Sequence, residues 1–292
     1  MCIRDRLLSG HVDSELLETA VNNCNIDSFL NKPWSNDELI TLVRSSIEEG
    51  KKKKRLSQKL KETCQQIESA SVHQNDRLPD PIENGNIVAD LIFKPLHILS
   101  GDIVDYEYTD TYFNFAIFDS AGNGTVAAME AYAMQKQVDL TNELEPKEFT
   151  EELNNRYAAD KSPSLFTMSL GRIDFATNRL SFCQAGAPNA YILSTDPSRR
   201  LERVGLGGFP IGYSTNESYE VQEIQLEKND CFIGFSENFT DRHAEALETL
   251  LYGLPSLSVE ALKINVSAWC DQLNQTDDIS AVFFQYKPNE IH

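Results

Sequence analysis

The chain has 292 residues, of which 41% are hydrophobic and 24% are charged, the composition of an ordinary globular protein of one or two domains. Asp and Glu number 45 against 26 Lys and Arg, so the formal net charge is −19. This excess of negative charge repels nucleic-acid phosphates and anionic lipid headgroups, so we expect neither nucleic acid nor membrane as a partner.

The sequence also lacks the marks of export. No apolar stretch reaches the roughly 18 residues of a membrane-spanning helix, and the charged residues 1–6 are not followed by the apolar stretch of a signal peptide. The six cysteines are scattered and form no C-x-x-C motif, which is typical of buried thiols in a reducing compartment. We therefore expect a cytoplasmic protein.

The first region, residues 1–48, has the order of elements that belongs to part of an α/β domain. The predicted elements are a strand at residues 7–8, a helix at 13–21, a strand at 26–30 and a last helix that starts near 35. Ser35 and Glu38 are spaced as a capping box at the start of that last helix. The region is too short to close a sheet, so we expect an incomplete domain.

The second region, residues 49–84, is predicted to be a helical or coiled linker. Its apolar residues form a narrow stripe on a helix: Leu56, Leu60, Cys64 and Ile67. Such a stripe allows a homodimer through paired linker helices, but the lysine run at 51–54 interrupts it. A solvated connecting helix stays an open alternative, and the breakers in residues 76–86 predict a loop before the next region.

The third region, residues 85–288, is predicted to be an α+β domain with largely antiparallel sheets, because strands follow one another with helices at intervals. Apolar, β-branched and aromatic runs predict strands at residues 87–93, 112–118, 166–173, 179–184, 190–193, 219–226, 230–235 and 280–286. Helices are predicted at residues 126–136, 146–158 and 259–273.

Acidic residues recur in this region where apolar strands meet turns. They are Asp102 with Asp105, Asp119, Glu237, and Asp277 with Asp278. Each one alone is typical of a turn. If they converge, their charges repel one another unless a cation neutralises them, and Mg²⁺ and Mn²⁺ prefer such oxygen ligands. Two such ions close together can activate water and hold phosphoryl oxygens.

These acids belong to a series of short motifs in a fixed order. The motifs are S-G-D-x-x-D at 100–105, D-S-A-G-N-G at 119–124, A-G at 185–186, G-F-P-I-G at 208–212, S-E-N-F-T-D at 236–241 and D-D-I-S at 277–280. In content, order and spacing they resemble the motifs of SpoIIE/RsbU-type PP2C phosphatases.

The resemblance implies a fold, a cofactor and a reaction. The fold is a β-sandwich flanked by helices, the cofactor is two Mn²⁺ or Mg²⁺ ions, and the reaction is hydrolysis of phosphoserine or phosphothreonine. The substrate that it implies is a phosphorylated regulatory protein such as an anti-sigma-factor antagonist.

The resemblance also implies roles for single residues, with Asp102, Asp119 and Asp277 as the catalytic set. Asp119 bridges the two metal ions, and the carbonyl of Ser120 joins the first. Asp277 and Glu237 hold the second ion, and Asp102 acts directly or through metal-bound water.

The sequence departs from the family pattern at the fourth ligand. Glu237 stands where the family has Asp, and Asn238 stands where it has Gly. One extra methylene displaces the carboxylate, and Mg²⁺ tolerates little misplacement. A catalytically weak or inactive PP2C-like pseudophosphatase that binds a partner therefore stays the alternative function.

Residues 1–48 resemble the C-terminal part of a response-regulator receiver domain. Ser9 takes the place of the switch Ser/Thr, Phe29 that of the switch aromatic residue, and Lys32 before Pro33 that of the phosphate-sensing lysine. The strands with the acidic pocket and the phosphoacceptor Asp are missing. A sensor kinase is therefore expected as a partner only for a full-length receiver, and the resemblance implies a two-component regulator with a phosphatase output.

Overall fold

The computed structural model describes residues 6–9, 28–31, 33, 35–122, 124–141, 145–159, 165–236 and 243–288. The chain divides into two compact units, Met1–Gln66 and Ile67–His292. Among the helices in the described ranges, none combines the length and the apolar character that a bilayer-spanning segment requires.

The first unit contains a pair of parallel strands, β1 (Arg6–Ser9) and β2 (Ser28–Asn31). Both coincide with predicted strands, and a parallel pair needs a long crossover connection between them. Ser9 lies on β1 and Phe29 on β2. The predicted helix at 13–21 and Lys32 lie outside the described residues.

Helix α2 (Asn36–Asn75) begins at the predicted capping box. The N–H of Glu38 donates to Ser35 Oγ at 3.2 Å, and the N–H of Ser35 donates to Glu38 Oε2 at 3.0 Å. The helix continues past residue 48, so the change in composition there is not a break in the helix.

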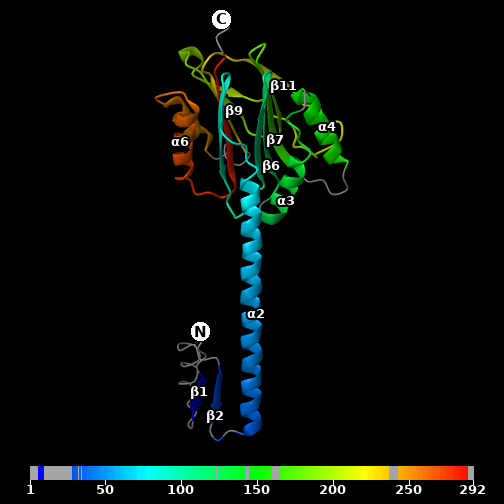
Figure 1. The fold of residues 1–292 in the computed structure, drawn as a ribbon, viewed down its shortest axis with the longest axis vertical. Helices are drawn as coiled ribbons and strands as arrows, with labels where there is room; N and C mark the ends of the chain where they lie inside the picture. The colour runs from blue at the N-terminus through cyan, green and yellow to red at the C-terminus, as the bar shows by residue number, and fades with distance from the viewer. Residues whose placement is uncertain are drawn as a thin grey trace. The chain divides into compact units, whose positions relative to one another are not determined.

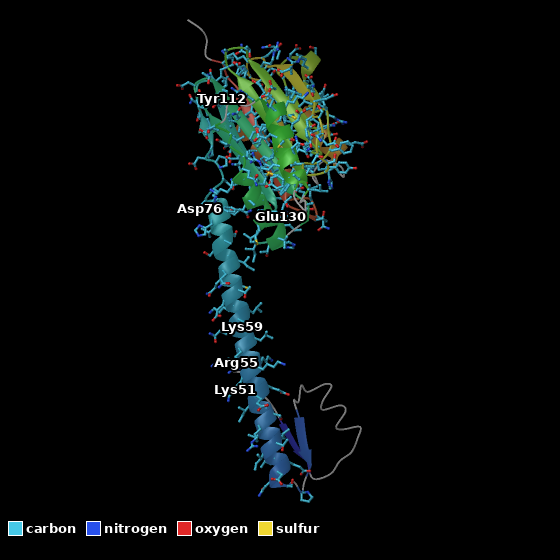
Figure 2. All side chains as sticks on the ribbon, turned by 90° about the vertical axis from the view of Figure 1, so that its right-hand side faces the viewer. Lys51, Arg55, Lys59, Asp76, Tyr112 and Glu130 are labelled. Atoms are coloured by element: carbon cyan, nitrogen blue, oxygen red, sulfur yellow. The ribbon has the colours of Figure 1, made fainter. Side chains whose placement is uncertain are left out.

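The lysine-rich part of α2 is solvated. None of the residues of α2 is buried, and the side chains of Lys51, Arg55 and Lys59 project from the helix (Figure 2). The apolar stripe is exposed as well, including Leu56 and Leu60.

The second unit contains two antiparallel sheets. The first has the order β10-β9-β12-β13-β4-β3 and the second has the order β11-β8-β7-β6-β5. The strands of the first sheet are β3 (Ile82–Glu83), β4 (Ile87–Lys94), β9 (Ala190–Leu193), β10 (Leu201–Val204), β12 (Cys231–Phe235) and β13 (Ile279–Tyr286). Those of the second are β5 (Asp102–Tyr108), β6 (Tyr112–Ser120), β7 (Phe166–Asp174), β8 (Arg179–Ala185) and β11 (Val221–Gln225).

Helices cover the outer faces of both sheets. They are α3 (Gly124–Gln135), α4 (Pro146–Ala158), α5 (Ala244–Tyr252) and α6 (Val259–Cys270). Helices α3 and α4 contact the second sheet, while α6 contacts β4 and β13 of the first, so the sheets lie between helical layers (Figure 1). The predicted α+β sandwich is confirmed, and each strand and helix predicted in this region overlaps an observed one.

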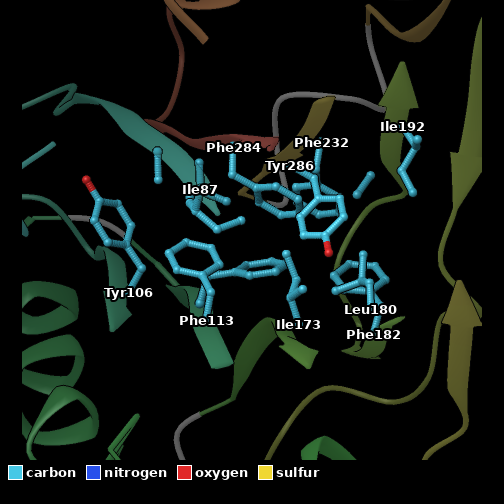
Figure 3. Close-up of a cluster of buried hydrophobic side chains, with 14 of the residues drawn as sticks. Ile87, Tyr106, Phe113, Ile173, Leu180, Phe182, Ile192, Phe232, Phe284 and Tyr286 are labelled. Carbon is cyan, nitrogen blue, oxygen red and sulfur yellow. The ribbon is translucent and has the colours of Figure 1, made fainter. Parts of the chain in front are cut away.

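An aromatic core holds the two sheets together (Figure 3). Phe113 and Phe115 of β6 pack against Phe232 and Phe284 of the opposite sheet. The rings of Phe232 and Phe284 stack with centroids 4.8 Å apart. Alternate residues of β6, such as Phe118, face the helices instead, which explains why β6 is apolar on both faces.

Candidate functional site

Asp102 and Asp119 face each other at one end of the second sheet. Asp102 is the first residue of β5 and is the register partner of Asp119 near the end of β6. Opposed residues in an antiparallel pair have Cβ atoms roughly 4.5–5.5 Å apart. Asp102 is only 2% exposed, whereas Asp119 is partly exposed, so one carboxylate lies beneath the other at the rim of the sheet.

Asp277 and Asp278 lie immediately before β13 of the first sheet. Asp278 is buried, and its carboxylate accepts the N–H groups of Leu96 at 2.7 Å and Gly101 at 2.8 Å. The start of β13 is therefore fastened to the residue that precedes Asp102. This positioning role of Asp278 was not predicted from the sequence.

One oxygen of the Asp102 carboxylate lacks a hydrogen-bond partner. Its Oδ2 atom is buried without a hydrogen-bond partner, as is Ser280 Oγ at the start of β13. Burial raises the pKa of Asp102 to about 7, the nearby hydroxyls of Ser280 and Ser236 limit the rise, and the charge of Asp278 adds to it. A buried carboxylate oxygen in this state is costly unless a cation neutralises it, so the residues present fit a divalent cation.

The full ligand set is not contained in the described residues. Within those ranges, no group of three or more His, Cys, Asp or Glu side chains is placed to hold a metal ion. The predicted ligand Glu237 and its neighbour Asn238 lie outside them. The described residues thus supply the Asp102–Asp119 pair and Asp277, which directly precedes Asp278.

Ser120 links the end of β6 to α3. Its N–H donates to the carbonyl of Gly101 at 3.2 Å, and its buried hydroxyl donates to the Glu130 carboxylate on α3 at 3.4 Å. The side chain therefore contacts the helix, and the main-chain carbonyl is the atom that the sequence predicts as a ligand. Gly122 and Gly124 have φ of 101° and 76°, a region that favours glycine, and they turn the chain into α3.

A cavity of about 550 Å³ borders Asp102. Its walls come from the last turns of α2, from β5 and from α3. On the α2 wall, Gln74 Nε2 donates to the carbonyl of Ser100 at 2.8 Å, and the N–H of Ser100 donates to Gln74 Oε1 at 3.0 Å. The end of α2 thus holds the segment that carries Asp102, a contact that no sequence motif marked.

The A-G and G-F-P-I-G motifs pack against each other. The N–H of Gly186 donates to the carbonyl of Gly208 at 3.0 Å. Gly186 has φ of 70°, and a Cβ there would lie 2.8 Å from Pro210 Cγ, so no larger residue fits. Ile211 pairs with Phe166 of β7 through two main-chain hydrogen bonds, of 2.8 and 3.2 Å. These motifs therefore build a loop on the second sheet and supply no acid to the site.

Comparisons with known proteins identify the family and the fold. The family model described as "Stage II sporulation protein E (SpoIIE)" matches residues 109–287. The "Phosphoserine phosphatase RsbP" of Bacillus subtilis (strain 168) is 24% identical over 210 residues, which cover 69% of this chain and 52% of RsbP. The chain therefore spans about half the length of this curated relative.

Solved structures share the fold of the second unit. The SiaA-PP2C domain of Pseudomonas aeruginosa matches with a TM-score of 0.64 and 16% identity, over 77% of this chain and 98% of that one. RsbX, solved in complex with magnesium, matches with a TM-score of 0.57 and 19% identity, over 71% of this chain and 98% of that one. At these identities the similarity shows the fold.

Proposed function

Because the chain belongs to the family of Stage II sporulation protein E (SpoIIE), and thus has a PP2C-type serine/threonine phosphatase domain related to RsbP, we propose that it is an active metal-dependent phosphatase. It hydrolyses phosphoserine or phosphothreonine on a regulatory protein. The phosphatase domain is residues 85–288, the helical linker is 49–84, and residues 1–48 are the C-terminal part of a receiver domain.

The observation that carries the proposal is the pair of opposed acids at the sheet rim, with Asp102 Oδ2 buried and without a hydrogen-bond partner. Asp102, Asp119 and Asp277 form the catalytic set. The ligand atoms come from these three residues, the carbonyl of Ser120 and the carboxylate of Glu237. Two Mn²⁺ or Mg²⁺ ions held by these residues would supply Lewis-acid chemistry for hydrolysis of the phosphate ester.

The protein's own groups orient this site. Asp278 holds Gly101 and so fixes the backbone of Asp102. Ser120 is held between Gly101 and Glu130, which fixes the end of β6. These contacts come from both sheets and from α3, so the acids are preorganised before the substrate arrives.

The regulatory context is part of the proposal. In the full-length protein the receiver takes a phosphoryl group from a sensor kinase, and Ser9, Phe29 and Lys32 are the remnants of its switch. Helix α2 transmits the signal and pairs in a homodimer through its exposed stripe. The substrate is a phosphoprotein of the anti-sigma-factor antagonist type, which the resemblance to RsbU-type enzymes and the name of RsbP, a phosphoserine phosphatase, support.

The alternative is a pseudophosphatase that binds a partner. The observation that favours it is Glu237, whose longer side chain stands at a predicted metal ligand. In that case the sandwich keeps its fold and its docking surfaces, while hydrolysis is slow or absent.

Turnover of p-nitrophenyl phosphate and of a phosphoserine peptide in Mn²⁺ separates the two functions. We expect turnover that Asp119→Asn or Asp277→Asn abolishes, together with a rise in melting temperature on adding Mn²⁺. Absence of both turnover and the rise would refute the enzyme. If Glu237 only detunes the site, Glu237→Asp raises the rate.

A further inference from the structure

The loop at residues 205–216 exposes large apolar side chains to water. Leu206, Phe209 and Tyr213, which we name the aromatic patch, are 53%, 51% and 56% exposed. The rings of Phe209 and Tyr213 stack, with centroids 4.6 Å apart and planes within 8°. Exposed aromatic side chains that cluster in this way are typical of protein–protein interfaces.

The main chain beneath the aromatic patch is fixed by the body of the domain. Its N–H groups donate to acceptors on other elements: Gly205 to Gln222 Oε1, Gly207 to Gln184 Oε1, Ile211 to the carbonyl of Phe166, and Gly212 to Asn154 Oδ1. The buried Asn154 of α4 also donates to the carbonyl of Ser214 at 2.8 Å. A loop held on several sides presents its aromatic side chains with little entropy to lose on binding.

The loop that carries the aromatic patch lies next to the strand that pairs with the end of β6. Ile211 pairs with Phe166, and Phe166 is in turn the register partner of Ser120. The adjacent Leu165, partly exposed, accepts the N–H of Ala121 at 2.9 Å. Two strand spacings of about 4.8 Å put the main chain of Ile211 roughly 10 Å from that of Ser120. An extended peptide crosses this distance in about three residues.

Charge explains why an apolar surface is needed beside this site. The chain carries a net charge of −19, and a phosphoprotein brings further negative charge. Long-range attraction therefore does not hold the two proteins together. The metal site would bind the phosphate of any phosphoprotein alike, so apolar contact at a short distance from the phosphate supplies affinity for the rest of the substrate.

Resting on the proposed function, we propose that the aromatic patch docks the phosphoprotein substrate. Leu206, Phe209 and Tyr213 bind apolar side chains that lie about three residues from the phosphorylated Ser or Thr. The patch thereby selects among phosphoproteins, while the acids at the sheet rim act on the phosphate itself.

Two synthetic phosphoserine peptides test the proposal. One carries Leu three residues before and after the phosphoserine, and its partner carries Gln at both positions. For the wild-type chain in Mn²⁺ we expect kcat/KM to be about tenfold higher with the Leu peptide than with the Gln peptide. The difference should lie in KM. A tenfold change corresponds to about 1.4 kcal/mol, which is the contribution of one well-placed interface residue. We expect the Phe209→Ala/Tyr213→Ala variant to lose this preference and to keep the wild-type rate with p-nitrophenyl phosphate.

The matched control is Tyr252→Ala, which removes an exposed aromatic side chain from α5 and should leave the preference intact. If the double variant melts at a lower temperature than the wild type, its fold is damaged. The single variants Phe209→Ala and Tyr213→Ala are then used in its place. An unchanged preference, or an equal loss of rate on p-nitrophenyl phosphate, overturns the docking role.

A binding measurement separates this proposal from the proposed function. Fluorescence anisotropy of the labelled Leu peptide gives Kd without turnover, and we expect it to be about tenfold weaker in the double variant. Equal Kd values overturn the docking surface even if the enzyme is active. A difference in Kd without turnover refutes the enzyme and keeps the surface. Analytical ultracentrifugation tests the other possible occupant. If the wild type sediments as a dimer and the double variant as a monomer, the patch is an interface between two copies of the chain, and the proposal is overturned.

Discussion

The carboxylate of Asp278 accepts the N–H of Gly101 at 2.8 Å, and this single contact joins the start of β13 to the start of β5. The two strands belong to different sheets. The aromatic core packs the two sheets together, and this contact of an acid that is not a predicted ligand fixes their ends at the candidate site.

Asp278→Ala should destabilise the domain and lower its activity. The substitution leaves the N–H groups of Gly101 and Leu96 without their acceptor, which costs about 2–4 kcal/mol in the free energy of unfolding. Urea unfolding and p-nitrophenyl phosphate turnover measure the two effects. Asp271→Ala is the control: its side chain is 69% exposed and pairs with Lys94, so it should cost less than about 1 kcal/mol. Equal losses in both variants would contradict the fastening role.

Asp102→Asn should stabilise the metal-free protein. A neutral amide replaces a buried carboxylate whose Oδ2 atom has no partner, and we expect a gain of about 1–3 kcal/mol in EDTA. Thermal unfolding in EDTA and then in Mn²⁺ checks this. Mn²⁺ should raise the melting temperature of the wild type more than that of the variant. Asp110→Asn, in the exposed turn between β5 and β6, should change neither value. Equal rises in melting temperature with Mn²⁺ in the wild type and the variant would disprove the metal role of Asp102.

Gly171→Ala should disrupt the core between the sheets. A Cβ on Gly171 of β7 would lie 2.2 Å from Cζ of Phe115, so the ring has to move within a close-packed core. Overpacking of this kind costs about 1–3 kcal/mol, which guanidinium unfolding measures. At Gly50 in α2 an added Cβ meets nothing within 4 Å, so Gly50→Ala should favour the helix by up to about 1 kcal/mol. Equal changes in the free energy of unfolding of the two variants would argue against the close contact between Gly171 and the ring of Phe115.

Gln74→Ala should loosen the end of α2. The variant loses both hydrogen bonds to the main chain of Ser100, which together contribute about 1–3 kcal/mol. Hydrogen exchange should become faster at residues 70–78 and at Ser100. Gln58→Ala removes an exposed glutamine whose side chain donates to Glu62 on the same helix, and it should leave exchange at Ser100 unchanged. Unaltered exchange in both variants would mean that the amide contact does not hold the helix.

The sandwich and much of the candidate site were predictable, because the signals are local. The apolar runs of β6 and β12 end at acids, and the capping box of Ser35 and Glu38 is readable from its spacing. Strand β5 was not predicted, since Asp102, Asp105 and Glu107 break its apolar pattern. Its stability comes from pairing with β6, which a single stretch of sequence does not reveal.

The different roles of Asp277, a predicted ligand, and Asp278, which accepts main-chain hydrogen bonds, could not be predicted for a related reason. Adjacent acids look alike in the sequence, and only the fold shows that the carboxylate of Asp278 is used by main-chain N–H groups. The contact of Gln74 with Ser100 is likewise a matter of tertiary structure. A glutamine in a polar helix carries no sign of a distant partner.

The position of β13 has a consequence for biosynthesis. It lies inside the first sheet, between β12 and β4, and Tyr286 pairs with Ile87 almost 200 residues earlier. Until β13 has left the ribosome, β4 and β12 have open edges, and Asp278 has not reached Gly101. Completion of the sheet and assembly of the acids are therefore one event, and a nascent chain that stops before residue 279 has neither.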